Sequence, residues 1–254
     1  MIKKIWETSV VLGDTHYPFH DVKAVNLVLA FIKWFQPDKI FLNGDIVDCW
    51  DISSFDKPVS IENRLKDELE QVRHFLKLLR EYAPHAESIY IFGNHEYRFE
   101  KYVSRFARNL AGLEGLTLEE QLHLKELNVI TINGHLRENF YRYGYLLIGH
   151  FNRVNKFSAY TAKNLLEEKG MSLIQNHTHR GGTSYKRDYR DTKIACENFC
   201  LCDLNPPYLQ IPNWQLGFST IFTNRKTKLF KIVPMEIIEY SLIPWFEMLG
   251  FEKK

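Results

Sequence analysis

Short apolar runs that stop at a glycine, with Asp, Asn or His soon after it, recur in this sequence. The run Ile89–Phe92 leads into Gly-Asn-His-Glu at residues 93–96. The same order is found at residues 13–16, Gly-Asp-Thr-His, and at residues 44–48, Gly-Asp-Ile-Val-Asp. Such runs are typical of buried strands that end in a tight turn, where polar side chains emerge at the edge of the sheet. Three strand ends of this kind predict one shared polar site.

Amphipathic helical patterns separate these strands. Apolar residues repeat at helical spacing between Asp21 and Phe35, with Asp21 as a candidate N-cap, and again between Ser60 and Tyr82. A strand–helix–strand connection favours parallel pairing, so the carboxyl ends of the strands lie on one edge of the sheet. The first hundred residues therefore predict an α/β fold.

The rest of the chain continues as mixed helix and strand. We expect helical structure at about 97–127 and 158–168, and strands near 128–132, 145–148 and 172–176. Strands near 194–202, 217–223 and 228–234 predict a C-terminal β region and tail over about 190–254. A chain of 254 residues can bury one sizeable core. We expect a single domain over residues 1–254, with 97–127 as a helical insertion.

Polar side chains follow two later strands as well, at His150 and at residues 176–179. Together the strand ends carry Asp14, His16, Asp45, Asp48, Asn94, His95, His150, His177 and His179. A single histidine after a strand is more often a hydrogen-bonded core or surface residue than a ligand. Five strand ends that combine Asp, Asn and His are hard to assign to chance. The spacings Asp-x-His and His-x-His also place two side chains on the same side of an extended segment.

The types of side chain indicate the kind of site. Oxygen and nitrogen ligands without thiolates suit Mn²⁺, Fe, Zn²⁺ or Ni²⁺. Even seven of these nine side chains are too many ligands for one tetrahedral ion, but they suit two ions bridged by a shared carboxylate. Two ions about 3.5–4 Å apart can stabilise both the attacking and the leaving oxygen of a phosphoryl displacement.

The five blocks, in order from residue 13 to residue 179, resemble those of the calcineurin-like metallophosphoesterases. The resemblance is specific because all five blocks are present together. It implies an α/β fold, a four-layer α-β-β-α sandwich with two mixed β-sheets. The segment Pro206–Phe218 is also similar to phage and prophage-type members of this superfamily.

The resemblance also implies a role for each residue of the blocks. Asp14, His16 and His179 would bind the first metal, Asn94, His150 and His177 the second, and Asp45 would bridge both. His95 would be the general acid that protonates the leaving group, and Asp48 would orient it, since a carboxylate partner favours imidazolium. The nucleophile would be a metal-bridging hydroxide. Mn²⁺ is the first choice of metal, with Fe, Zn²⁺ or Ni²⁺ as alternatives.

Two positions depart from the family pattern. Asn176 stands where the family usually has glycine before His-x-His, so the backbone there can differ. Cys49 follows Asp48 where Ser/Thr protein phosphatases have a phosphate-binding Arg-Gly, which argues against that activity. The candidates for phosphate contact are instead Arg98, Arg153 and Arg180. Arg180 is the first choice because it directly follows His179.

The substrate is less constrained than the metal centre. Basic and aromatic residues follow several blocks, at residues 97–99, at 185–190 and at Trp214, and such mixtures can stack bases and neutralise phosphates. The leading hypothesis is a phosphodiesterase with DNA or RNA as a candidate substrate, although the net charge of +2 provides no global basic field. The alternatives are a phosphomonoesterase for a small molecule and a non-catalytic binding protein on the same fold. The complete ligand set argues against the last.

Cysteine usage and apolar run length indicate the compartment. Four cysteines in a chain of this length do not form a disulfide pattern. We expect Cys196, Cys200 and Cys202 to be a structural cluster, with a zinc site as the alternative. No apolar run reaches the about 18 residues of a membrane span, and the N-terminal residues lack the apolar region of a signal peptide. These features predict a cytoplasmic protein without a membrane partner.

Overall fold

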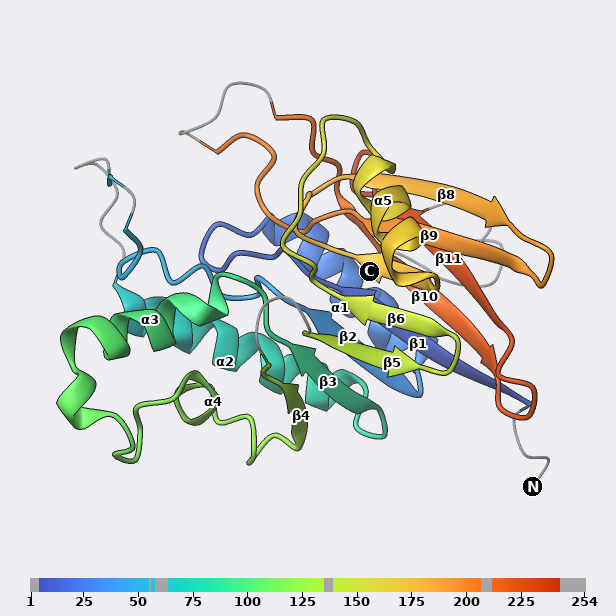
Figure 1. Ribbon diagram of the computed structural model, residues 1–254. Coiled ribbons are helices and arrows are strands. Elements are labelled where there is room, and N and C mark those ends of the chain that lie inside the picture. Colours follow the sequence, from blue (N-terminus) through green and yellow to red (C-terminus); the bar gives the residue numbers. More distant parts are fainter. Residues whose placement is uncertain (1–4, 55, 58–63, 135–138, 207–211, 243–254) are drawn as a thin grey trace.

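Two mixed β-sheets lie face to face at the centre of the structure (Figure 1). The computed structural model describes residues 5–54, 56–57, 64–134, 139–206 and 212–242. The first sheet has the order β11 (Phe230–Glu236), β10 (Gly217–Asn224), β1 (Trp6–Leu12), β2 (Lys39–Asn43), β3 (Glu87–Ile91) and β4 (Val129–Ile132). The second has the order β5 (Phe140–Tyr143), β6 (Leu146–Gly149), β7 (Ser172–Gln175), β9 (Thr192–Asn198) and β8 (Gly181–Arg187).

Parallel pairing aligns the strand ends that carry the polar blocks. In the first sheet β1, β2, β3 and β4 are parallel, whereas β10 pairs antiparallel with β1 and β11 pairs antiparallel with β10. In the second sheet β6, β7 and β9 are parallel, and β5 and β8 are antiparallel edge strands. The carboxyl ends of β1, β2 and β3 therefore share one edge of their sheet, and those of β6 and β7 share one edge of the other.

Helices cover the outer face of each sheet, which gives four layers. α1 (Val22–Phe35) and α2 (Leu65–Tyr82) pack on the first sheet, and α5 (Tyr160–Lys169) packs on the second (Figure 1). One apolar core lies under α1 and α2, a second lies between the sheets, and a third lies under α5. The predicted α-β-β-α sandwich with two mixed sheets is confirmed.

Alternation of side chains along the strands divides the apolar residues between these cores. In β1, Val11 belongs to the core between the sheets, whereas Val10 and Leu12 belong to the core under the helices. Phe41 in β2 likewise faces the second sheet. Because successive side chains point to opposite faces and both faces are buried, residues 10–12 of β1 and 40–42 of β2 are apolar at every position.

The start of α1 agrees with the prediction from the sequence, whereas the start of α2 differs from it. Asp21 caps α1, since its extended backbone lets the carboxylate accept from Ala24 N at 2.9 Å. α2 begins at Leu65, later than predicted, and Arg64 is extended. Residues 60–63 of the predicted helix lie outside the described residues.

The region between β3 and β4 is helical, as expected for residues 97–127. It contains α3 (Glu96–Phe106), the short helix η1 (Arg108–Leu110) and α4 (Leu118–Gln121). In the part of the chain that the structure describes, no helix is long and apolar enough to cross a bilayer. The single domain with this insertion stays a prediction.

The sequence did not predict two of the strands, and the predicted C-terminal β region is divided between the two sheets. β5 and β8 are edge strands, and β8 (Gly-Gly-Thr-Ser-Tyr-Lys-Arg) lacks an apolar alternation because little of it is buried. Within the predicted C-terminal β region, β9 joins the second sheet, whereas β10 and β11 join the first. Residues 243–254 of the predicted tail lie outside the described residues.

Candidate metal centre

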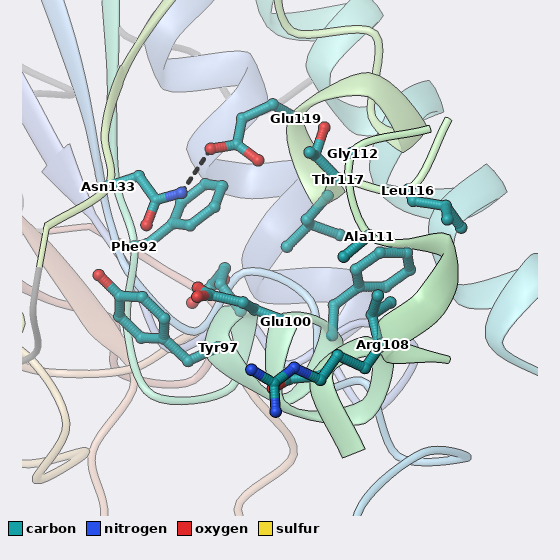
Figure 2. A pocket seen from close by; sticks show the side chains of 15 residues that line it. Phe92, Tyr97, Glu100, Arg108, Ala111, Gly112, Leu116, Thr117, Glu119 and Asn133 are labelled. Atoms are coloured by element: carbon teal, nitrogen blue, oxygen red, sulfur yellow. Dashed lines mark hydrogen bonds between the residues drawn. The ribbon is translucent and has the colours of Figure 1, made fainter. Parts of the chain in front are cut away.

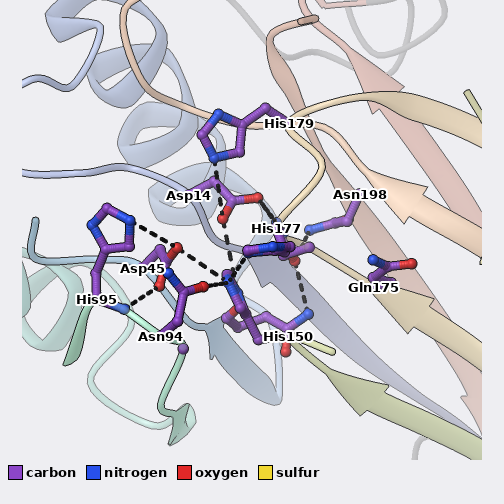
Figure 3. A network of polar contacts seen from close by, with 12 residues as sticks. Asp14, Asp45, Asn94, His95, His150, Gln175, His177, His179 and Asn198 are labelled. Atoms are coloured by element: carbon purple, nitrogen blue, oxygen red, sulfur yellow. Dashed lines mark hydrogen bonds and ion pairs between the residues drawn. The ribbon is translucent and has the colours of Figure 1, made fainter. Parts of the chain in front are cut away.

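The side chains that follow β1, β2, β3, β6 and β7 meet in one polar cluster (Figure 3). Glycines permit the close approach at two of these strand ends. Gly44 has φ +82°, and a Cβ there would lie 2.5 Å from His150 Nδ1. A Cβ on Gly93 would lie 2.3 Å from Asp45 Oδ1. A residue larger than glycine at position 44 or 93 would therefore force these strand-end turns apart.

Many of the predicted ligands stand on strained backbone. Positive φ angles occur at Asp14 (50°), His16 (51°), Asp45 (50°), His177 (78°) and His179 (58°). The left-handed region is uncommon for residues other than glycine, and such strain persists where the surrounding structure holds it, typically at functional sites. Five of the seven predicted ligands are thus among the residues with positive φ.

Asp14, His16 and His179 form the first group of potential ligands. His16 Nε2 lies 3.1 Å from His179 Nε2, and Asp14 Oδ1 lies 3.7 Å from the same atom. His16 Nδ1 lies 2.9 Å from Asp48 Oδ2, so the Nδ1 proton is directed to Asp48 and Nε2 is left with its lone pair. Asp14 Oδ1 is buried without a hydrogen-bond partner among the described residues. A cation between these atoms would use all three lone pairs.

Asp45, His150 and His177 form the second group, with Asn94 beside it. His150 Nδ1 donates to the Asn43 carbonyl oxygen at 3.0 Å. His150 Nε2 then faces Asp45 Oδ2 at 3.1 Å, His177 Nδ1 at 3.2 Å and Asn94 Oδ1 at 3.2 Å (Figure 3). A single proton can serve only one of these contacts, whereas a cation at their centre could be bound by all of them.

Burial shifts the pKa of Asp14 and that of His177 toward the neutral form of each side chain. It raises the pKa of Asp14 to about 7. Burial, with His150 nearby, lowers the pKa of His177 to about 3, so His177 is a neutral base at neutral pH. A buried carboxylate needs a positive partner, and a neutral imidazole is the form that binds metals. The oxygen and nitrogen donors fit cations of the Mn²⁺, Fe, Zn²⁺ or Ni²⁺ type.

His95 and Asp48 are in contact, but Asp48 is shared with other partners. His95 Nδ1 lies 3.1 Å from the Asp48 carbonyl oxygen and 3.3 Å from Oδ2, which also binds His16. Arg98 Nη1 donates to Asp48 Oδ1 at 2.9 Å, and Arg98 Nη2 lies 3.0 Å from His95 Nε2. Burial alone would raise the pKa of Asp48, but hydrogen bonds from His16 and His95 lower it. Asp48 therefore stays a carboxylate that orients two imidazoles at once.

His95 also lies within coordinating reach of the cluster. Its Nε2 is 3.7 Å from Asp45 Oδ2, and the donor atoms of His16, Asp45 and His95 are close enough to share a cation. The role of His95 as an acid rather than a ligand stays a prediction.

The structure places the three candidate arginines in different surroundings. Arg98 lines the cavity over the cluster. Arg153 is exposed and pairs with Glu168. Arg180, the first choice, donates to the carbonyl oxygens of residues 155 and 156 at 2.6 and 2.9 Å and is buried. Its guanidinium holds the loop before α5, so neither Arg153 nor Arg180 is brought to the cluster.

Glu96 has a role that the sequence did not indicate. Its Oε2 accepts from Gly93 N at 2.7 Å and from Asp45 N at 2.9 Å. Its Oε1 accepts from Ile46 N at 2.8 Å and from Tyr90 Oη at 2.7 Å. This buried carboxylate therefore ties the turn after β3 to the turn after β2. Its position inside the same block as two site residues was the one available signal.

Asn176, which departs from the family pattern, forms a hydrogen bond with Asp14. Its Nδ2 donates to Asp14 Oδ2 at 3.1 Å, and its Oδ1 accepts from Asn43 at 2.7 Å and from Asn198 at 3.1 Å. A Cβ on Gly13 would lie 2.8 Å from Asn176 Cγ. The larger residue at position 176 is thus accommodated by the glycine at position 13.

The three cysteines of the predicted cluster do not all lie together. All four cysteines of the chain are buried and free. Cys196 lies between the sheets, with Sγ 3.9 Å from Ser219 Oγ, and burial raises its pKa to about 12. Cys200 and Cys202 lie behind His179, with Cys202 Sγ 3.6 Å from His179 Nδ1. The side chains of His179, Cys200 and Cys202 are close enough to share a cation. The zinc alternative therefore concerns Cys200 and Cys202 without Cys196.

A cavity of about 620 Å³ lies over the metal-competent cluster. Residues of both ligand groups line it, together with His95, Arg98, Trp50 and Trp214. The other basic and aromatic residues are elsewhere. Tyr97 and Phe99 are in the core, and residues 185–190 lie at the far end of β8, about 20 Å from the end that follows His179.

A second cavity, of about 510 Å³, lies between α3 and α4 (Figure 2). Phe92 and Tyr97 lie on one side of it, and Glu119 there accepts from Asn133 at 2.6 Å. None of the predicted metal ligands lines this cavity. The cavity over the metal-competent cluster is therefore the candidate functional site.

The fold and this cluster agree with a family assignment. Residues 8–213 match the model of the calcineurin-like phosphoesterases, and the chain belongs to that family. Among its relatives is the Gene 54 protein of Mycobacterium phage L5, 32% identical over an alignment of 241 residues that covers 89% of this chain and 92% of that protein. The Gene 54 protein of Mycobacterium phage D29 is 33% identical over 184 residues, 68% of this chain and 69% of that protein. The expected similarity to phage-type members is confirmed.

More distant solved structures are similar as well. Wild-type Vps29 from Entamoeba histolytica, complexed with zinc, is 12% identical with a TM-score of 0.46, over 93% of this chain and 96% of that one. YfcE, a phosphoesterase from E. coli, is 10% identical with a TM-score of 0.40, over 89% of this chain and 98% of that one. Neither similarity extends beyond the fold.

Proposed function

We propose that this protein is a metal-dependent phosphoester hydrolase that acts on phosphodiesters, with DNA or RNA as a candidate substrate. The position of Asp45 carries the proposal. Its Oδ2 lies 3.1 Å from His150 Nε2 in one ligand group and 3.8 Å from His16 Nε2 in the other. A carboxylate shared in this way suits two adjacent cations, the arrangement that stabilises both oxygens of a phosphoryl displacement.

Two divalent transition-metal ions, Mn²⁺ by preference, would be held by the clustered side chains. The first group is Asp14, His16 and His179, the second is Asn94, His150 and His177, and Asp45 joins both. When bound, such ions supply a nucleophile from water at neutral pH and neutralise phosphoryl oxygens. The hydrogen bonds of His16 to Asp48 and of His150 to the Asn43 carbonyl fix which ring nitrogen faces the ions.

His95 is the candidate general acid. It lines the cavity beside Asp45, and its Nδ1 is held by Asp48, so Nε2 faces the cavity. A histidine fixed in this way can donate a proton to a leaving oxygen bound next to it. Arg98 Nη2 donates to the same Nε2 at 3.0 Å, so the acid form of His95, which carries a proton there, requires Arg98 to turn from His95 to the phosphate, and Arg98 is the candidate phosphate contact.

A phosphomonoesterase would use the same ions and the same histidine, so the substrate has to be tested directly. We expect the Mn²⁺-loaded protein to hydrolyse bis-p-nitrophenyl phosphate at least as fast as p-nitrophenyl phosphate. A large preference for the monoester would contradict the diester proposal. Absence of both transition-metal binding and hydrolysis would favour the non-catalytic binding protein.

The Asp45→Asn variant tests the shared carboxylate. We expect it to lose bound metal and hydrolysis together, by more than the roughly 10–100-fold that loss of an outer-shell partner costs. Elemental mass spectrometry and the rate of bis-p-nitrophenyl phosphate hydrolysis measure the two effects. Asp67→Asn is the matched control, because Asp67 is an exposed carboxylate in the first turn of α2. An Asp45→Asn protein with two bound ions and the full rate would refute the assignment.

A further inference from the structure

Four aromatic rings form a continuous row along the cavity over the metal-competent cluster. The ring centroids of His95 and His16 are 4.4 Å apart, those of His16 and His179 are 4.8 Å apart, and those of His179 and Trp214 are 4.3 Å apart. All four side chains line the same cavity. His95 is therefore at one end of the row and Trp214 at the other.

This order gives the two organic groups of a phosphodiester different surroundings. In the proposed reaction His95 protonates the leaving oxygen, so the leaving group lies at the His95 end. The phosphate itself lies over the ligands in the middle of the row, next to Asp45 and His16. The group that stays on phosphorus is then directed along the row toward Trp214.

The loop that carries Trp214 is fixed to the ligand-bearing segment. Gln215 N donates to the His179 carbonyl oxygen at 3.0 Å, and the Gln215 carbonyl oxygen accepts from Cys200 N at 3.1 Å. The Gln215 side chain also accepts from Gly181 N at 3.1 Å. The indole is partly exposed but is held in one place, so it can offer a binding surface without a further cost of ordering.

Thr178 provides a second, independent sign of a ligand in this cavity. It lines the cavity between His177 and His179, and its side chain is only 5% exposed. Its Oγ1 is buried and has no hydrogen-bond partner among the described residues. An unsatisfied buried hydroxyl is unfavourable, and a polar group of a bound ligand would relieve it. A ligand that is both aromatic and polar therefore fits this cavity.

We infer that the group retained on phosphorus is a nucleoside whose base stacks on Trp214, so that the substrate is a nucleotide-containing phosphodiester. The inference rests on the proposed function and specifies its substrate class. Every base has a flat π face, so stacking on one indole selects nucleotides without selecting a base sequence. Trp214 is thus the specificity-determining residue of the site.

Two esters with the same leaving group test this inference. The p-nitrophenyl ester of thymidine 5′-monophosphate retains a nucleoside on phosphorus, whereas methyl p-nitrophenyl phosphate retains a methyl group. We expect the Mn²⁺-loaded wild-type protein to have a kcat/KM roughly 5- to 100-fold higher for the thymidine ester, the range that stacking of one base supplies. The common leaving group makes the demand on His95 equal for both.

The Trp214→Ala variant should lose most of this preference, and Trp214→Phe should retain part of it. Trp6→Ala is the matched control, since Trp6 is 47% exposed at the opposite end of β1 from Asp14. Metal content is measured in every variant, because Trp214 packs against the ligand His179. Loss of metal in both Trp214 variants would mean that Trp214 only supports His179 and would overturn the inference.

The remaining outcomes separate the inference from the proposed function. Equal kcat/KM values for the two esters in the wild type, or an unchanged preference in metal-replete Trp214→Ala, would overturn the stacking role and leave the hydrolase standing. If the wild type hydrolyses neither ester, the proposed function fails and calorimetry decides the inference. Thymidine 5′-monophosphate should then bind more tightly than methyl phosphate, and only when Trp214 is present. Equal binding would overturn it.

Discussion

At the residue scale, Glu96 restrains Asp45, the proposed bridging carboxylate, without being one of the proposed metal ligands. Its two oxygens accept from Gly93 N, Asp45 N, Ile46 N and Tyr90 Oη. Asp45 is one of the residues with positive φ, so its turn is strained and needs such restraint. The geometry of the shared ligand is therefore set by a residue that neighbours the proposed acid His95 in sequence.

The Glu96→Gln variant tests this restraint. Glutamine has one acceptor oxygen, and its NH₂ group would face backbone N–H donors and leave at least one of them unpaired. We expect a loss of about 1–3 kcal/mol in the free energy of unfolding and a roughly 10–100-fold weaker affinity for Mn²⁺. Urea unfolding and metal titration measure these effects. Glu100→Gln, an exposed glutamate one turn further along α3, should change neither.

The His95→Ala variant separates an acid from a ligand. If His95 protonates the leaving group, the variant keeps its bound metal and loses roughly 10²–10⁴-fold in rate. The loss should be smaller for p-nitrophenyl esters than for alkyl esters, because a good leaving group needs less protonation. His85→Ala, an exposed histidine, is the control. Equal losses across leaving groups, or loss of metal, would count against the acid role.

At the scale of elements, the sequence predicted what is local and missed what depends on distant partners. Each glycine-ended block is a local signal, because the turn, the backbone strain and the ligand lie within a few residues. The edge strands β5 and β8 bury too little surface to show a pattern, and the pairing of β10 with β1 joins segments far apart in the chain. The Arg180 guanidinium binds the carbonyl oxygens of residues 155 and 156, because adjacency to His179 does not determine where a long side chain is bound.

A buried glutamate in the first turn of α2 shapes one wall of the cavity. Glu68 accepts from Trp50 N at 3.0 Å and from Asp51 N at 3.4 Å, and so fixes the backbone of Trp50. Burial, with the Asp48 charge, raises the pKa of Glu68 from 4.5 to about 8. The folded protein therefore binds this proton more tightly than the unfolded chain does.

The raised pKa of Glu68 predicts a pH-dependent stability. Between pH 4.5 and about 8 the folded state holds more protons than the unfolded state, so this group's contribution to the free energy of unfolding is lost as pH rises. Glu68→Gln keeps an acceptor for Trp50 N and removes the titration. We expect the stability of the metal-free wild type, relative to Glu68→Gln, to fall between about pH 5 and about pH 8 in urea unfolding. Parallel pH profiles would contradict the prediction.

At the scale of the whole molecule, the metal-competent cluster joins the two sheets. Asp14, Asp45 and Asn94 follow strands of the first sheet, whereas His150, His177 and His179 follow strands of the second. The apolar core between the sheets and buried hydrogen bonds such as Asn43 Nδ2 to Asn176 Oδ1 also hold them together. The contact between Asp45 and His150 crosses from one sheet to the other. Cations bound there would therefore bridge both sheets.

Metal binding should accordingly stabilise the whole fold. An ion that binds only the folded state contributes about 2.7 kcal/mol at a concentration of 100 times its Kd, which for a chain of this length is a rise in Tm of about 5–10 °C. Thermal unfolding with EDTA and with Mn²⁺ measures the rise, which Asp45→Asn should lose and Asp67→Asn should keep. Hydrogen exchange should slow together after β3 in one sheet and after β6 and β7 in the other. Protection limited to one sheet would contradict the proposed ligand groups, because each of them combines side chains from both sheets.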